Sequence, residues 1–449
     1  MIKKVEKLFI TPISPCLKEE RNNPREMREM SAQIKIQVTM AAVAALSLIL
    51  AGADDAQAVN MAELNAVCDL VKPIESDTAK LPTVEALEGD IDILRALNMS
   101  TAEPEWRKQF PKEEQTGKAG PDPCQQDSDN PNCHPEWKQW AKDSIKAAAK
   151  GTRPNDLEVP TAKLEIPKGR AASITIAAAT AAAIYEKEQF DQQYKQDLTD
   201  VANKVKTAIG KAVYGSAYTV ATPTPACPTA SGGDRQTICK MPNTGAALCH
   251  VLACLCSKNN AGTMTNDVCG NPTTQTVTAG PAAGYVTAAA ELINVCQKRL
   301  PIEPNAPYIR THITKIRSML KTKGNNGAFG VVLETIGTSA TCGDVVGTAC
   351  ADFTTALAAK TSNTVDEIQW ENQLSNAADI LEKAREAAAA QKALKIRLNA
   401  LKKQAETTFE HLVNTKTTSV ATLSVIRQKE QGKAAQQKQE CKGLTKVTL

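Results

Sequence analysis

The amino-acid sequence predicts a mainly α fold: an elongated antiparallel bundle of long coiled-coil helices that carries a disulfide-rich, loop-rich lobe. Of the 449 residues, 42% are hydrophobic but only 4% are aromatic. A core built from small apolar residues, alanine above all, favours helices that approach closely. Two long segments contain no proline, whereas residues 216–280 between them are dense in Thr, Pro, Gly, Asn and Cys. This middle segment cannot bury enough apolar surface unaided, and cross-links would supply its order.

The first proline-free segment, residues 171–214, predicts one continuous helix. Apolar side chains recur in it at steps of three or four residues, which indicates a heptad-like stripe on one helical face. At about 1.5 Å per residue, this helix would reach roughly 60 Å. The stripe consists of Phe190, Tyr194, Leu198, Val201, Val205 and Ala208.

The second proline-free segment predicts a helix from Thr364 to about Gln431, with a capping box formed by Thr364 and Glu367. Shorter helices are expected after an N-cap at Thr83 and over residues 135–151, 282–299 and 307–321. We find no convincing alternating strands and no internal repeat. The expected core stripe of the last long helix is Leu394, Ile396, Leu398, Leu401, Ala405, Phe409 and Leu412.

The N-terminal region has the pattern of a secretory signal. Lys35 precedes an apolar run over residues 40–51, and Ala56-Gln57-Ala58 forms an A-x-A cleavage site, so we expect cleavage after Ala58. The run is too short to remain as a spanning helix, which needs about 20 apolar residues. Residues 1–29 are a polar upstream extension, and translation starting at Met30 would leave Cys16 out of the protein.

The cysteines are interpreted as disulfides of a secreted chain. A zinc site is expected to show paired C-x2-C spacing, and a thioredoxin-like redox centre is expected to show C-x-x-C. The sequence from Cys249 onward instead has the spacing C-x4-C-x-C-x12-C. An even number of inner cysteines in an exported segment is typical of a disulfide framework, whose pairing the spacing leaves open. The candidates are Cys68, Cys124, Cys133, Cys227, Cys239, Cys249, Cys254, Cys256, Cys269, Cys296, Cys342 and Cys350. Cys441 is left over and needs a partner elsewhere.

Motifs of known reaction chemistry are missing from the sequence. There is no G-x-S-x-G, H-E-x-x-H, Walker A or dinucleotide glycine fingerprint, so we expect no catalytic residue, no metal site and no cofactor. A net charge of +4 lacks the concentrated basic surface of a nucleic-acid binder. Asn98-Met99-Ser100 is a candidate N-glycosylation site. Trp137 and Trp140 are expected to pack on the body, with a partner site as the alternative.

Together, the signal, the long helices around a cysteine-rich lobe and the residues Cys254, Cys256 and Cys269-Gly270 resemble one family. The chain is similar to the variant surface glycoproteins of African trypanosomes, specifically to their B-type N-terminal domain. The resemblance covers residues 59–432, and residues 433–449 are expected to be a linker and the start of a C-terminal domain that the chain lacks. The family also implies an anchor signal, for which the sequence after Cys441 offers no small-residue and apolar pattern. We therefore expect a truncated coding frame, or a protein that is soluble or held by a partner.

The resemblance implies a coat glycoprotein that shields the parasite from host antibodies and evades immunity by antigenic variation. Its expected partners are itself, as a homodimer or homotrimer, host antibodies, and the outer leaflet of the plasma membrane through a glycosylphosphatidylinositol anchor. No nucleic acid is expected. The alternative is a coat-derived surface receptor that binds a host serum ligand on the same scaffold. A secreted disulfide-rich enzyme is disfavoured because no convergent set of acid, base and nucleophile is found.

Overall fold

The computed structural model describes residues 58–75, 78–110, 134–221, 225–257, 268–270, 283–299, 302–325, 328–334, 342–343, 349–357 and 367–415. All of them belong to the second of two compact units, Ala58–Leu449. This unit is mostly helical, which confirms the predicted mainly α class; the coiled-coil geometry stays a prediction.

The helices are α2 (Met61–Val71), α3 (Glu88–Thr101), α4 (Pro104–Arg107), α6 (Trp137–Ala148), α7 (Thr161–Glu165), α8 (Pro167–Gln193), α9 (Lys195–Leu198), α10 (Val201–Tyr214), α11 (Arg235–Ile238), α12 (Asn243–Ala246), α13 (Leu248–Cys256), α14 (Ala283–Gln297), α15 (Ala306–Met319), α16 (Thr354–Leu357) and α17 (Gln369–Asn414). Short 3-10 turns are η1 (Lys72–Glu75), η2 (Thr78–Lys80) and η3 (Pro154–Asp156). The strands are β1 (Leu320–Asn325), β2 (Ala328–Leu333) and β3 (Ala351–Asp352).

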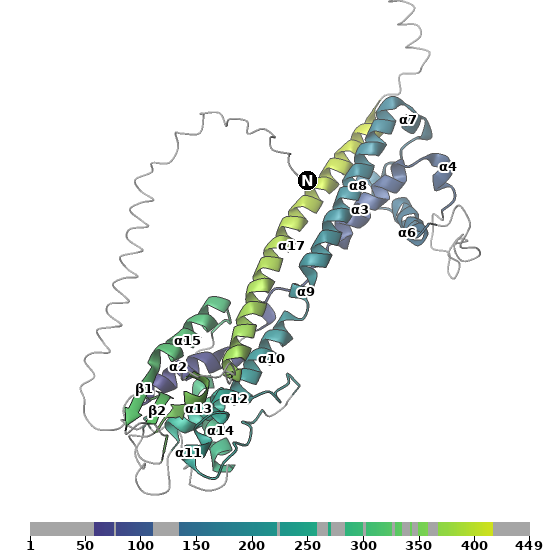
Figure 1. Ribbon diagram of the computed structural model, residues 1–449. Coiled ribbons are helices and arrows are strands. Elements are labelled where there is room, and N and C mark those ends of the chain that lie inside the picture. Colours follow the sequence, from purple (N-terminus) through teal and green to yellow (C-terminus); the bar gives the residue numbers. More distant parts are fainter. Residues whose placement is uncertain are drawn as a thin grey trace, which may run out of the picture. The chain divides into compact units, whose positions relative to one another are not determined.

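Helix α17 has 46 residues and belongs to two hydrophobic cores. It runs alongside α8 and reaches the lobe beside α10 (Figure 1). Its first half, including Trp370 and Leu374, packs into the core of the lobe formed by α2, α10 to α15 and the sheet. Its second half, including Leu398 and Phe409, packs into the core of a bundle with α3 and α8. Buried alanines on α17 leave room for close helix contacts, as the alanine-rich composition predicts. The helix therefore connects the two cores as one continuous rod of about 69 Å.

Polar contacts fix the direction of α8 against α17. Lys163, just before α8, donates from Nζ to the carbonyl oxygen of Val413 near the end of α17. Farther along the chain, Glu186 Oε1 lies 3.5 Å from Arg397 Nη1. Residue numbers that increase along α8 thus lie beside residue numbers that decrease along α17, so the two helices are antiparallel.

Helix α3 completes the bundle and runs parallel to α17. Glu85 Oε2, just before α3, lies 2.5 Å from Lys395 Nζ, and Asp90 Oδ1 lies 2.5 Å from Lys402 Nζ. Numbers therefore rise together on the two elements. The side chain of Gln391, only 4% exposed, donates to the carbonyl oxygen of Thr83 and accepts from the Glu85 amide.

These contacts correct the expected start of α3. Thr83 does not cap the helix, which begins at Glu88 after Leu87. The backbone of residues 83–85 makes its hydrogen bonds with Gln391 instead. A buried amide on a distant helix thus outcompetes the local capping pattern.

The predicted continuous helix over residues 171–214 is wrong in one respect. It is divided into α8, α9 and α10, and Asp200 between the last two has a left-handed φ of 56°. An L-residue in this region interrupts an α-helix. The predicted stripe still faces the cores, with Phe190, Leu198 and Val205 at most 5% exposed.

The expected limits of the last helix and one stripe position are also wrong. Helix α17 begins at Gln369 after Ile368 without a side-chain cap and ends at Asn414, and Thr364 of the predicted capping box lies outside the described residues. Glu367 instead accepts a hydrogen bond from Asn372 through Oε2. Ile396 is 64% exposed, whereas Leu398 is fully buried.

A three-stranded antiparallel sheet, in the order β1-β2-β3, was not expected from the sequence. Leu320 pairs with Leu333 and Asn325 with Ala328, while Leu333 also pairs with Ala351 of β3. Asn326-Gly327 lies between the first two strands, and Asn-Gly between extended segments is a strong hairpin signal that the glycine-rich context obscures.

Replacing Leu398 by Ala should lower the free energy of unfolding by about 2–5 kcal/mol, because it removes a fully buried side chain from the bundle core. Ile396→Ala, two residues away on the exposed side of the same helix, is the matched control and should change it by less than about 0.5 kcal/mol. Denaturant unfolding of both variants measures the difference. Equal costs at the two positions would contradict the assigned face of α17.

Candidate functional site: a disulfide-bonded lobe

The centre of the lobe is α13, whose sequence LCHVLACLC has no polar face. Every one of its nine side chains is buried. A helix that is apolar on all sides is stable only when surrounded by protein. Helix α13 was not expected from the sequence, because residues 216–280 were predicted to form loops and an apolar run without polar positions gives no periodic signal.

Three disulfide bonds attach α13 to its surroundings. Cys249 and Cys254 reach back to segments before the helix, and Cys256 reaches forward to the segment after it. Closing such loops reduces the entropy of the unfolded chain. The pairs are Cys227–Cys249, Cys239–Cys254 and Cys256–Cys269.

Two further disulfides join other parts of the lobe. Cys68 on α2 is bonded to Cys296 on α14, 228 residues later, so the first helix of the unit is tied to a much later one. Cys342 and Cys350, eight residues apart, close a short loop before β3.

Within the described residues, ten of the twelve candidate cysteines are therefore joined in disulfide pairs. Cys124 and Cys133 lie outside the described residues, as do Cys16 and Cys441. All ten belong to the buried core of the lobe, which separates their sulfurs from soluble reductants.

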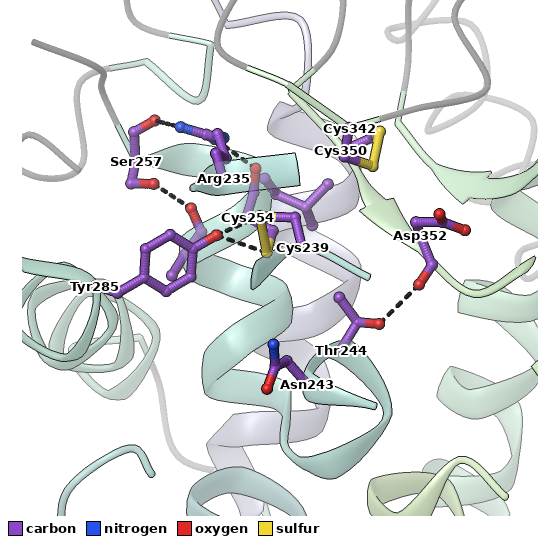
Figure 2. The surroundings of a disulfide bond; sticks show 12 residues. Arg235, Cys239, Asn243, Thr244, Cys254, Ser257, Tyr285, Cys342, Cys350 and Asp352 are labelled. Atoms are coloured by element: carbon purple, nitrogen blue, oxygen red, sulfur yellow. Dashed lines mark hydrogen bonds between the residues drawn. A yellow bond between two sulfur atoms is a disulfide. The ribbon is translucent and has the colours of Figure 1, made fainter. Parts of the chain in front are cut away.

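Arg235 stabilises the C-terminal end of α13 (Figure 2). Its side chain is 1% exposed and donates from Nη1 to the carbonyl oxygen of Ser257 at 2.9 Å and from Nη2 to that of Cys254 at 2.6 Å. A cation at this position satisfies carbonyls that lack a partner within the helix and faces the negative end of its dipole. Tyr285, on α14, places its hydroxyl 2.7 Å from Cys254 Sγ and beside Cys239 Sγ.

Hydrogen bonds continue from the disulfides to α17. The Asp352 amide donates to the carbonyl oxygen of Cys239 at 2.8 Å. Thr244 Oγ1 donates to the carbonyl oxygen of Asp352 at 2.8 Å (Figure 2). The indole of Trp370, at the start of α17, donates to the carbonyl oxygen of Thr244 at 3.0 Å. Hydrogen bonds and apolar contacts thus connect the lobe to α17.

The first described residues of the chain also make hydrogen bonds within the lobe. The side chain of Asn60 donates to the carbonyl oxygens of Leu255 and Ala349, and its amide donates to that of Val268. Asn60 follows the expected cleavage position, Ala58, by two residues. Cleavage itself stays a prediction, since residues 1–57 lie outside the described part.

One cluster has the residue types of a metal site. Among the described residues, the sulfurs of Cys227 and Cys249 and an imidazole nitrogen of His250 lie within 4.8 Å of one another. Both sulfurs belong to a disulfide, so neither is a thiolate that could bind zinc. In the oxidised lobe this cluster is part of the core.

The candidate glycosylation site Asn98 lies on α3 and is half-buried. Ser100 of the same triplet is buried, and its Oγ donates to the carbonyl oxygen of Ala96 at 2.7 Å. Asn98 lines a cavity of about 580 Å³ between α3, α7 and α8. Its modification stays a prediction.

The two tryptophans of α6 pack on the body of the protein. Trp137 lies 4.6 Å from Phe110 and Trp140 lies 5.3 Å from Trp106, measured between ring centroids. Together with Ala96, Met99 and Ala147 they form a third, small core between α3, α4 and α6.

Acidification should destabilise the lobe through His250. Burial lowers the pKa of this imidazole from 6.5 to about 4, and it is 2% exposed. The unfolded chain therefore takes up a proton at higher pH than the folded one, and stability is lost as pH falls from 6.5 toward 4. Between about pH 7.5 and about pH 4.5 the loss should be roughly 2–3 kcal/mol.

Unfolding of the wild type and of His250→Gln at both pH values measures this effect. Carboxylates titrate equally in the two proteins, so the difference between their pH dependences isolates His250. The variant should lose less stability on acidification. Identical pH dependences would show that the imidazole is not buried in its neutral form.

Comparison with known protein families matches residues 42–400 to the trypanosomal VSG domain, described under the family name VSG_B. No curated protein sequence matches the chain at a significant level. Within the described residues, no helix combines the length and apolar character needed to cross a bilayer. The match covers most of the 449 residues and includes the disulfide-bonded lobe and most of α17. The chain belongs to the trypanosomal VSG domain family and is a surface coat protein of these parasites.

Proposed function

We propose that the chain works as a steric shield, covering the parasite surface against host antibodies and taking part in antigenic variation. The observation that carries the proposal is the family match over a lobe cross-linked by five described disulfides and joined to one 46-residue helix. Such a construction holds its shape outside a cell without any catalytic centre. The lobe presents the epitopes, and the bundle spaces it from the membrane.

Parasites that display this chain as their coat should bind antibodies raised against the lobe and exclude antibodies against invariant, membrane-proximal surface proteins. Flow cytometry with both antibody types measures the shielding. Cells whose coat has been trimmed by protease are the control, and they should bind the membrane-proximal antibodies. Equal binding before and after trimming would contradict a shielding role.

We further propose that the chain self-associates, and α8 offers a surface for this contact. Its exposed side has the apolar residues Ile174, 69% exposed, and Tyr185, 61% exposed, which are eleven residues or about three turns apart. Ala171, Ala178 and Ala181 lie on the same side at steps of three or four. Exposed aliphatic and aromatic side chains on one helical face, with small residues between them, suit close packing against a second copy.

The double variant Ile174→Asp with Tyr185→Asp should sediment as a monomer at concentrations where the wild type forms a dimer or trimer. Charges introduced on both sides of a shared apolar seam repel each other and lose hydration. Thr311→Asp, at an exposed position of α15, is the control and should leave assembly unchanged. A monomeric wild type, or an assembled double variant, would refute this surface.

Attachment through a glycosylphosphatidylinositol anchor is the mode that the family implies for the cell surface. Release of the protein from intact parasites by a phosphatidylinositol-specific phospholipase tests it. The second candidate function is a receptor for a host serum ligand. It is favoured by the cavity of about 580 Å³ beside Asn98, and a serum pull-down that retains a stoichiometric partner would support it.

A further inference from the structure

A second cavity lies between the C-terminal end of α3, α4, α6 and residues 153–161. It has a volume of about 310 Å³, and its lining includes Arg107, Arg153, Ser144 and Thr161. Cavities of about 300 Å³ are at the lower end of those that hold small organic molecules. Two guanidinium groups on one small cavity are unusual in a chain whose other described arginines are mostly exposed or ion-paired.

Both arginines keep donors that the described residues do not use. Arg107 donates from Nη1 to the carbonyl oxygen of Ser100 at 2.8 Å, and Arg153 Nη1 lies 3.5 Å from Glu158 Oε1. The Nε atoms of both are buried and have no hydrogen-bond partner within the described part of the chain. A guanidinium has five N–H donors, and leaving a buried one unpaired costs free energy.

The positive charge of the cavity is poorly balanced. The side chain of Arg153 is 11% exposed, whereas that of Glu158, its ion-pair partner, is 84% exposed. Burial lowers the pKa of Arg107, and the attraction of Glu158 compensates only in part. Lys108 adds a further positive charge at the rim, although its side chain is 69% exposed and pairs with Glu105. An anion entering the cavity would therefore be favoured by the charge of the two guanidinium groups.

We propose that this cavity binds the phosphate or sulfate group of a small molecule. The planar fork of an arginine donates two parallel hydrogen bonds to such an oxyanion, and Arg107 and Arg153 present theirs from two elements. The hydroxyls of Ser144 and Thr161 lie on the same lining and suit the remaining oxygens. Glu158, the carboxylate on the lining, competes with the ligand for Arg153.

A purely structural role for these residues makes the opposite prediction for Glu158. If the two arginines only cap α3 and hold residues 153–158, then Glu158 is a stabilising partner and its removal weakens the fold. If they bind an anion, its removal frees Arg153 and tightens binding. Saturable anion binding that tightens in Glu158→Gln therefore indicates a binding site, whereas lower stability of this variant without saturable binding indicates a structural role.

The test is thermal unfolding of the full chain in rising concentrations of inorganic phosphate, inorganic sulfate or chloride at constant ionic strength. A ligand that binds only the folded protein raises its stability in a saturable way. We expect saturation with phosphate or sulfate and none with chloride. The anion that gives the lower dissociation constant identifies the ester class of the ligand.

Arg153→Gln should weaken binding of that anion by about tenfold or more, and Glu158→Gln should tighten it by about threefold or more. Arg385→Gln, at an exposed position of α17, is the matched control and should bind as the wild type does. An equal response to all three salts, or weaker binding in Glu158→Gln, would overturn the proposal. Should Arg153→Gln fail to fold, the Glu158→Gln result still decides. None of these outcomes depends on the shielding function.

Discussion

The oxidised state of the α13 cysteines is the constraint on which the lobe depends. A nonapeptide helix with no polar face has no stable place on a surface, and its neighbours before and after it are short helices and irregular segments. Three disulfides close loops of 13 to 22 residues around it and remove much of the freedom that the unfolded chain would otherwise regain. Arg235 then satisfies the carbonyl groups at its end. Without these bonds, the residues around α13 have too little periodic apolar surface to specify one arrangement.

Helix α17 connects the cross-linked lobe to the bundle. The Thr244–Trp370 hydrogen bond joins its first turn to the cross-linked lobe, and the apolar residues of its second half belong to the core shared with α3 and α8. A helix is stiff over tens of ångströms. Because α17 belongs to both hydrophobic cores, it joins them rigidly. Under the proposed shielding function, this continuity would let α17 hold the cross-linked lobe at a fixed distance from the far end of the bundle.

The sequence predicts well what depends on local pattern. The helical class, the buried faces of residues 190–208 and the oxidised cysteines follow from periodicity and compartment. Features that depend on residues distant in the sequence are not predicted by local pattern. Gln391 makes the hydrogen bonds of residues 83–85, and Asp200 adopts a left-handed φ. Ile396 is exposed to solvent, although its neighbours suggest a core position. Disulfide pairing and the arginine-lined cavity are likewise products of topology. Arg107 and Arg153 are far apart in the chain and share no motif.

The most direct measurement is alkylation of the native, unreduced protein followed by mass spectrometry of its linked peptides. We expect no label on Cys249, Cys254 or Cys256, and we expect each of them to be recovered in a peptide bonded to Cys227, Cys239 or Cys269, respectively. Labelling of any of these six sulfurs before reduction, or a different set of linked peptides, would contradict the account of a lobe held together around α13.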